Sequence, residues 1–248
     1  MTHYLYKSIV EPLTLELNDD NATVYISPIT SPCPSIEPPP AKSPLNLVYG
    51  AATISVDCET TIKAVDTFED LIGGNEVFQA RTKKVGVLTK EVAEEYGVSG
   101  PILRASGVEF DLRKQSDYLP YDKFDFEIPI GENGDCFDRW SVRTSEMRES
   151  AKIILQAIED MPSGPIQAKV PKVIKVPKGQ TYVRAENPKG EMGYYIISEG
   201  GLGPYRLKIR TASFSNISIL PIMLEGALLP DLIAIMGSLD FVLGDVDR

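Results

Sequence analysis

Apolar residues recur at helical spacing in one long stretch of the chain, residues 135–161. Val142, Met147, Ile154 and Ile158 lie close to a 3.6-residue repeat in "DCFDRWSVRTSEMRESAKIILQAIEDM", and "PSGP" follows. An apolar stripe of this spacing, ended by glycine and proline, is typical of an amphipathic helix. At about 1.5 Å per residue the helix would be roughly 35 to 40 Å long, enough to form the spine of a domain.

Two shorter helices are predicted before this long one. In "CETTIKAVDTFEDLIGGN", which starts at Cys58, apolar residues again share one helical face, and the glycine pair supplies a stop. The segment "TKEVAEEYGVSGP" has Thr89 at the N-cap position, Gly97 after the last turn and Pro101 beyond it. These signals describe fold and not function.

After the long helix, short apolar runs replace the helical repeat. The runs "GYYIIS" and "YRLKIR" have the composition of strands, and the intervening "EGGLGP" is typical of a hairpin connection. The segment "SILPIMLEGALLPDLIAIMGSLD" is hydrophobic on nearly every face, so we expect it to be buried on most sides. A helical core with a small antiparallel sheet, residues 182–210, predicts an α+β fold.

The first 57 residues differ from the rest in composition and in the spacing of their apolar residues. Residues 1–27 contain two short apolar runs around the polar turn "ELNDDN", which predicts a short strand-like arm. Residues 28–57 contain seven prolines, all between Pro28 and Pro44. Proline favours extended backbone and has no amide donor, so we expect a proline-rich linker there. The main domain is then expected to span residues 58–248.

The charge balance disfavours polyanionic partners. The chain has 25 Lys and Arg residues against 35 Asp and Glu residues, a net charge of −10. This excess of negative charge opposes binding to nucleic acid, so no nucleic-acid partner is expected. No long apolar run follows a basic start, so neither a secretory leader nor a membrane span is expected.

Histidine and cysteine are scarce. His3 is the single histidine, which argues against a Ser-His-Asp triad or a histidine-rich metal site. The three cysteines, Cys33, Cys58 and Cys136, are far apart and form no Cys-x-x-Cys pair, so we expect no metal site and no disulfide framework. The glycine-rich "GGLGP" lacks the strand-to-helix context of a nucleotide fingerprint.

Several charged residues interrupt apolar surroundings and need partners. Asp111 lies two residues before Arg113, which favours a structural ion pair. For Asp240, within "SLDFV", a functional and a structural role are equally supported. On the long helix, four charges at i, i+3 and i, i+4 spacings permit a ladder of charge pairs, but a simple solvated face is favoured: they are Asp138, Arg139, Arg143 and Glu146.

Four long blocks then resemble one known family. They are "SGPILRASGVEFDLRK", "GDCFDRWSVRTSEMRESAKII", "NPKGEMGYYIISEGGLGPYRLKIR" and "LLPDLIAIMGSLDFVLGDVDR". In order and spacing they resemble the D subunit, or 49 kDa subunit, of NADH-quinone oxidoreductase (respiratory complex I), over about residues 59–248. The fingerprint residues within the blocks are Arg104, Ser106, Gly107, Asp111, Arg113, Asp138, Arg139, Arg143, Glu146, Arg206, Arg210, Asp245 and Asp247.

The resemblance implies a hydrogenase-large-subunit-like helical core without the hydrogenase metal. That metal needs two Cys-x-x-Cys pairs, and "GDVDR" occupies the end where the second pair would be expected. The resemblance also implies a place in the cavity where quinone, the substrate, is reduced. Carried onto this chain, Asp240 and Val242 are expected at the pocket and Arg248 beside them, where charge could act on the headgroup.

The family further implies the chain's setting in a multisubunit oxidoreductase that couples electron transfer to proton translocation. This chain would bind no cofactor alone, since iron–sulfur clusters and FMN belong to partner subunits. The expected partners are the terminal-cluster subunit and the C (30 kDa) subunit. The expected location is peripheral, on the cytoplasmic side of the bacterial inner membrane, or on the matrix or stroma side in an organelle.

Residues 1–55 do not resemble the family's N-terminal half, where the histidine and tyrosine proposed to protonate quinone lie. We therefore expect no redox activity from the chain alone. A split subunit whose other half is a separate chain, a truncated reading frame and a divergent structural paralogue are the three explanations, and a split or truncated subunit is favoured. The alternative function is a non-catalytic scaffold or assembly fragment of the same family.

Overall fold

The computed structural model of the chain describes residues 23–26, 45–49, 52–56, 58–116, 118–160, 173 and 175–247. Helices and a small antiparallel sheet follow one another along the chain, so the fold is α+β, as the sequence predicted. Within the described ranges, no helix combines the length and the apolar character needed to cross a bilayer.

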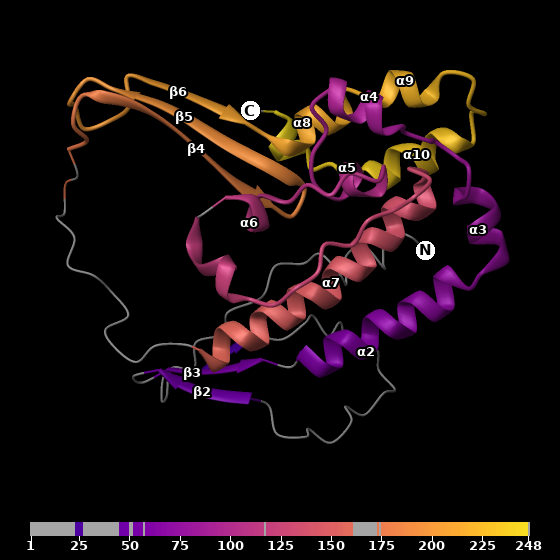
Figure 1. Ribbon diagram of the computed structural model, residues 1–248, viewed down its shortest axis with the longest axis horizontal. Coiled ribbons are helices and arrows are strands. Elements are labelled where there is room, and N and C mark those ends of the chain that lie inside the picture. The colour runs from indigo at the N-terminus through magenta and orange to yellow at the C-terminus, as the bar shows by residue number, and fades with distance from the viewer. Residues whose placement is uncertain are drawn as a thin grey trace.

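The long helix α7 (Cys136–Glu159) is central to the helical part, and helices from before and after it in the sequence pack along it (Figure 1). The side chain of Asp135 caps its N-terminus by accepting a hydrogen bond from the Asp138 amide at 2.9 Å. Helix α2 (Cys58–Phe68) runs alongside α7, and the short π-helical turn η1 (Glu69–Gly73) continues it. The predicted long helix is confirmed within two residues at each end.

Short helices join these two long ones to the rest of the domain. Thr89 and Gly97 punctuate α4 as the sequence predicted: the Thr89 hydroxyl accepts from the Val92 amide, and Gly97 has φ +63°. The short elements between α2 and α7 are α3 (Glu76–Thr82), α4 (Lys90–Glu95), α5 (Pro101–Ala105), α6 (Leu112–Gln115) and the 3-10 turn η2 (Leu119–Lys123).

The principal core lies where α4, α5 and the start of α7 meet the C-terminal helices. Those helices are α8 (Ala212–Ile217), α9 (Leu220–Leu224), α10 (Asp231–Leu239) and α11 (Leu243–Val246). Leu88, Ile102, Cys136 and Ile235 are all at most 2 % exposed in this core. A smaller cluster between α2 and α7 contains Cys58, Ala151 and Ile158.

The segment from Ile219 to Leu239 departs from its expected burial on most sides. The inward-facing residues are Ile219, Met223, Ile235 and Leu239. Three other large apolar side chains of the segment are exposed instead: Leu228 by 67 %, Leu229 by 82 % and Ile233 by 74 %. The expectation was wrong because α9 and α10 cover the core from one side, and within this chain no described element packs on their outer side.

Strands β4 (Gly179–Asn187), β5 (Gly190–Ser198) and β6 (Arg206–Arg210) form an antiparallel sheet in the order β4-β5-β6. The β4–β5 turn lies against the helices, whereas the opposite end of the sheet projects away from them (Figure 1). The predicted strands and hairpin are confirmed, and the sheet begins at Gly179.

A second sheet lies in the N-terminal part. Strand β1 (Thr23–Ile26) pairs in parallel with β3 (Ala52–Val56), and β2 (Leu45–Tyr49) pairs antiparallel to β3. Strands β2 and β3 lie inside the range expected to be a linker, 28–57, so the end of that range is paired strand. The physical reason is that the prolines end at Pro44, and the amides beyond it are free to pair. The other residues of 1–57 are outside the described residues.

Candidate functional site

Asp240, one of the predicted pocket residues, ends α10 in the left-handed conformation, with φ 50° and ψ 42°. The Lys189 ammonium, in the turn between β4 and β5, donates a hydrogen bond to the Asp240 carboxylate. The Arg143 guanidinium on α7 lies 3.5 Å from the same carboxylate. The aspartate therefore lies between two cations that come from two other elements of the fold.

The position of Lys189 is fixed by close packing of its turn. A Cβ added to Gly100 would lie 2.5 Å from the Gly190 Cα, so only glycine permits this approach. The Asn216 side-chain amide, on α8, donates to the Lys189 carbonyl at 3.0 Å and to the Ser99 carbonyl at 3.2 Å. The β4–β5 turn, the start of α5 and α8 are thus held together beside Asp240.

Arg139 of α7 is fully buried and holds α10 in register with α7. Its guanidinium donates to the Ser238 hydroxyl at 2.9 Å, the Gly134 carbonyl at 2.7 Å and the Gly86 carbonyl at 2.8 Å. Burial, the largest effect, lowers the pKa of Arg139. This arginine therefore serves as a structural clamp just ahead of the Asp240 turn.

The C-terminal residues continue from Asp240 along the edge of α8. Val242 is 43 % exposed, and its amide donates to the Ser213 hydroxyl at 3.4 Å. The Asp245 carboxylate accepts from the Ser213 amide at 2.8 Å, which secures α11 to the first turn of α8. Asp247 is exposed at the end of α11, and Arg248 lies outside the described residues.

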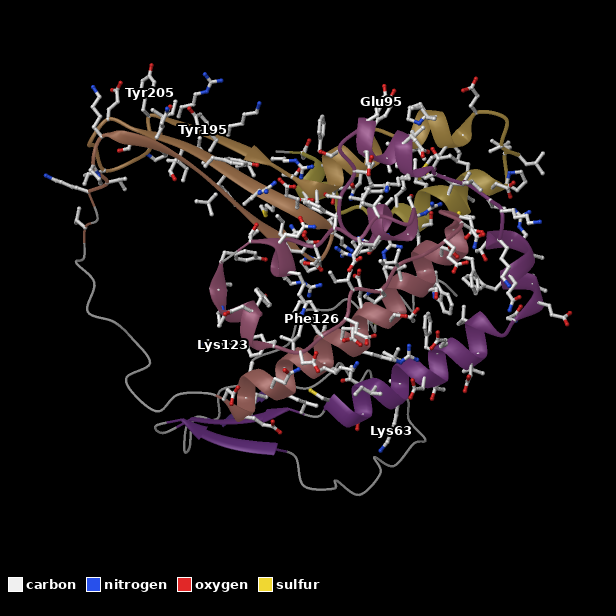
Figure 2. All side chains as sticks on the ribbon, viewed as in Figure 1. Lys63, Glu95, Lys123, Phe126, Tyr195 and Tyr205 are labelled. Atoms are coloured by element: carbon white, nitrogen blue, oxygen red, sulfur yellow. The ribbon has the colours of Figure 1, made fainter. Side chains whose placement is uncertain are left out.

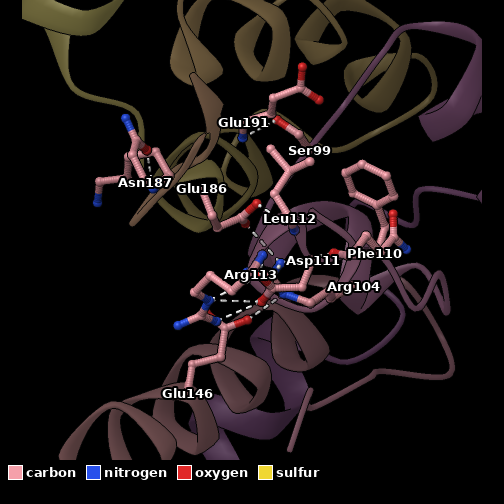
Figure 3. A network of polar contacts seen from close by, with 12 residues as sticks. Ser99, Arg104, Phe110, Asp111, Leu112, Arg113, Glu146, Glu186, Asn187 and Glu191 are labelled. Carbon is pink, nitrogen blue, oxygen red and sulfur yellow. Dashed lines mark hydrogen bonds and ion pairs between the residues drawn. The ribbon is translucent and has the colours of Figure 1, made fainter. Parts of the chain in front are cut away.

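A second group of charged residues forms a buried ionic cluster, which we define as Arg104, Asp111, Arg113, Glu146 and Glu186 (Figure 3). Arg104, 2 % exposed, lies at its centre. Its guanidinium contacts Glu146 at 2.6 Å, Glu186 at 3.0 Å and Asp111 at 3.5 Å. Arg113 pairs with Asp111 at 2.6 Å, so the predicted structural pair is confirmed.

Burial and charge act in opposite directions on the pKa values of this cluster. Burial is the largest effect on Asp111 and favours a raised pKa, but the hydrogen bonds and charge of Arg113, with the charge of Arg104, lower the pKa overall. Burial is also the largest effect on Glu186, and here it raises the pKa in spite of the opposing Arg104 charge. Glu186 is therefore held less firmly ionised than Asp111.

The solvated face favoured for the charges on α7 is wrong for Arg139. Arg139 is buried, and Glu146 pairs with Arg104 of α5. Asp138 accepts hydrogen bonds from the Glu132 and Asn133 amides at 2.9 and 2.6 Å, which fixes the loop before the helix. Sequence spacing along one helix could not show that α5, the loop before α7 and α10 supply partners for these charges.

The remaining fingerprint residues have structural positions. Ser106 is buried and donates to the Ile102 carbonyl, and Gly107 has φ +84° at the end of α5. Arg210 donates to the Glu191 carbonyl at 2.6 Å, which joins β6 to β5. Arg206, on β6 as well, is exposed.

Glu186 and Lys189 were not among the candidate residues, although both contact them. Both lie within the quoted block "NPKGEMGYY" or just before it, and neither interrupts an apolar run. Glu186 is 82 residues from Arg104, and Lys189 is 51 residues from Asp240. The helix-breaking "NPKG" turn was a detectable local signal, but no local pattern indicates which distant charges it meets.

Two open hollows are described on the surface. The larger, of about 500 Å³, is lined by Tyr182, Tyr195, Lys208 and Arg210 on the projecting sheet. The other, of about 230 Å³, lies between residues 129–133 and the first half of α7. Neither of these two hollows is lined by Asp240 or Val242.

The match to known proteins covers the four sequence blocks quoted above. The family model of the respiratory-chain NADH dehydrogenase 49 kDa subunit matches residues 51–175 and 169–248. The NADH-quinone oxidoreductase D subunit 2 of Solibacter usitatus (strain Ellin6076) is 49 % identical over 191 residues, which covers 77 % of this chain and 52 % of that protein.

Two further relatives give the same result. The NADH-quinone oxidoreductase D subunit of Methylacidiphilum infernorum (isolate V4) is 48 % identical over 209 residues, 74 % of this chain and 50 % of that protein. The D subunit of Carboxydothermus hydrogenoformans (strain ATCC BAA-161 / DSM 6008 / Z-2901) is 52 % identical over 186 residues, 75 % of this chain and 51 % of that protein. The chain spans about half the length of these curated relatives. With its core, its ionic cluster and its Asp240 turn all inside the matched residues, the chain belongs to the family of the respiratory-chain NADH dehydrogenase 49 kDa subunit.

Proposed function

We propose that the chain works as part of a complex I subunit, and that Asp240 and Val242 form one wall of the cavity where quinone is reduced. The observation that carries the proposal is the family match, together with about 50 % identity to D subunits of NADH-quinone oxidoreductase. Within such a complex the activity would be electron transfer to quinone, coupled to proton translocation.

The geometry around Asp240 supports this role. A quinone has an apolar ring and tail and two polar carbonyl groups, so its pocket needs apolar walls beside a few fixed polar groups. Val242 offers an exposed apolar side chain, two residues from a carboxylate that Lys189 and Arg143 hold in place. In this proposal the chain binds and orients the substrate, and the redox centres are the iron–sulfur clusters and FMN of partner subunits.

The family also supports finer proposals about architecture and setting. We propose a hydrogenase-large-subunit-like helical core, with α7 as its central helix. The proposed partners are the terminal-cluster subunit, the C (30 kDa) subunit and the part of the family sequence that completes the pocket. The proposed location is peripheral, on the cytoplasmic side of a bacterial inner membrane or the equivalent side in an organelle.

The test is made in the assembled complex, with Asp240→Asn and Val242→Ala in the full chain. We expect an unchanged amount of complex with an altered KM for quinone and altered sensitivity to quinone-site inhibitors. A lost apolar contact of this size changes binding by roughly tenfold. The matched control is Asp247→Asn, which removes the same charge from an exposed position nearby.

Two results would contradict different parts of the proposal. Unchanged KM and inhibitor sensitivity in both variants would remove Asp240 and Val242 from the pocket and favour a supporting role. A complex that assembles with full activity in the absence of this chain would refute its membership.

A further inference from the structure

The two faces of the β4–β5–β6 sheet differ in character. The register places Tyr182, Tyr195 and Lys208 side by side on one face, and Val183, Tyr194 and Ile209 on the other. We call the first the cationic face and define it by Tyr182, Arg184, Tyr195, Arg206, Lys208 and Arg210. Figure 2 shows Tyr195 on the part of the sheet that projects away from the helices.

The cations on this face are only partly neutralised. The Arg184 guanidinium lies 3.8 Å from the Glu191 carboxylate, and Arg210 donates to backbone carbonyls. Arg206 and Lys208 are exposed and make no ion pair with any residue in the described part of the chain. Two positive charges therefore face outward, although the chain as a whole has a net charge of −10.

The two tyrosines that line the hollow on the cationic face are held by contacts within the sheet. A Cβ on Gly193 would lie 2.5 Å from the Tyr182 hydroxyl, so the absence of a side chain there lets the tyrosine ring lie across the strand. The Tyr195 hydroxyl donates to the Gln180 side chain at 2.7 Å. Small-molecule sites enclose most of their ligand, whereas this hollow is open and lined by four side chains, which suits a side chain of another protein.

We propose that the cationic face binds an acidic segment of a partner polypeptide, with an Asp or Glu side chain paired to Arg206 or Lys208 beside the hollow. Tyr and Arg are the residues that dominate protein–protein hot spots, and opposite charge steers association. Anionic lipid surfaces are bound by clusters of about four to eight Lys and Arg residues. This face has four, and two of them, Arg184 and Arg210, already have partners in the chain. The proposal is independent of the quinone pocket, since Asp240 pairs with Lys189 in the β4–β5 turn and does not line this hollow.

The first experiment identifies what touches the face. The full chain, carrying Lys208→benzoylphenylalanine, is expressed with the other subunits of the complex, irradiated, and its crosslinked peptides are sequenced by mass spectrometry. We expect one partner segment with more carboxylates than cations. Crosslinks only to a neutral or basic segment, only to lipid or nucleic acid, or to nothing, would overturn the proposal.

The second experiment tests the charge. Arg206→Glu with Lys208→Glu should weaken association with the identified partner at least about tenfold in low salt, chiefly through a slower association rate, and the difference should shrink in high salt. Reversing the crosslinked carboxylate to lysine in the partner should restore binding.

The matched control for this experiment is Lys90→Glu with Lys123→Glu, which makes the same charge change at two exposed positions outside the sheet. It should leave association unchanged. Equal weakening by both pairs, or no restoration by the charge swap, would refute the proposal. Normal association of the reversed pair, alongside altered quinone kinetics in Asp240→Asn, would refute this contact and leave the proposed function standing.

Discussion

Replacing Arg104 by methionine removes the central cation of the buried ionic cluster and leaves an unbranched apolar side chain that is shorter by most of the guanidinium. In the native protein two guanidinium groups face three carboxylates in this cluster. The variant leaves Asp111, Glu146 and Glu186 with Arg113 as the remaining cation. The change also leaves the Phe110 carbonyl without the hydrogen bond that Arg104 donates at 3.0 Å.

The expected loss is large because the site is buried. Arg104 is 2 % exposed and the side chain of Glu186 is 4 % exposed, so water cannot replace the lost partner. Removing one member of a buried charge pair costs about 3 to 5 kcal/mol, because the other charge remains desolvated. We expect Arg104→Met to lower the free energy of unfolding by this amount at neutral pH.

The loss should depend on pH in a direction set by Glu186. Burial already raises the pKa of Glu186, and removing Arg104 removes an influence that lowers it. A carboxyl whose folded pKa is raised stabilises the fold below its unfolded pKa, and that contribution is lost as pH rises through the folded pKa. The cost of Arg104→Met should therefore be smaller at about pH 5 than at about pH 7.

The assay is urea unfolding of the full chain, followed by tryptophan fluorescence. Trp140 is the single tryptophan and lies on α7 among the rings of Phe68, Phe78 and Phe137, so its emission reports the packing of this helix. The matched control is Arg206→Met at an exposed position. This substitution should change the free energy of unfolding by no more than about 0.5 kcal/mol.

Two results would refute the reasoning. One is a loss below about 1 kcal/mol, the size of an exposed ion pair. The other is a loss of equal size at both pH values. Adding Glu186→Gln to Arg104→Met gives a further check, because removing the stranded charge should restore about 0.5 to 3 kcal/mol.

Three further predictions concern other parts of the fold. Gly100→Ala should prevent folding or lower Tm sharply in thermal unfolding, because the new Cβ would meet Gly190 backbone and the conformation, φ +73° and ψ −149°, suits glycine alone; a Tm near the native one would contradict this. Asp135→Ala should cost about 1 to 2 kcal/mol in urea unfolding, since the carboxylate caps α7 and also accepts from the Lys84 amide at 2.8 Å; a neutral effect would show that neither bond matters. Arg148→Gln should cost no more than about 1 kcal/mol, and less in high salt, because its ion pairs with α2 and η1 are partly exposed; a salt-independent loss of several kcal/mol would be inconsistent with that exposure.

The candidate site was predictable only in part. Asp240 could be singled out because it interrupts an apolar run, and Asp111 because Arg113 follows two residues later. Lys189 and Glu186 could not, since an exposed-looking lysine in a turn and a glutamate at the end of a strand have no local signature. Their roles depend on partners 51 and 82 residues away, and that distance is closed by the fold.

The sequence by itself determined the punctuation of the chain. Helices begin at the capping side chains of Thr89 and Asp135, and one ends before Gly97, whose φ is positive. The segment "EGGLGP" connects two strands. These features are readable from sequence because capping and turn formation involve residues a few positions apart. The tertiary structure decided which charges meet and which apolar surfaces stay uncovered. Arg139 became a buried clamp and Leu229 an exposed side chain because burial depends on which elements pack together, and chain-distant contacts decide that packing.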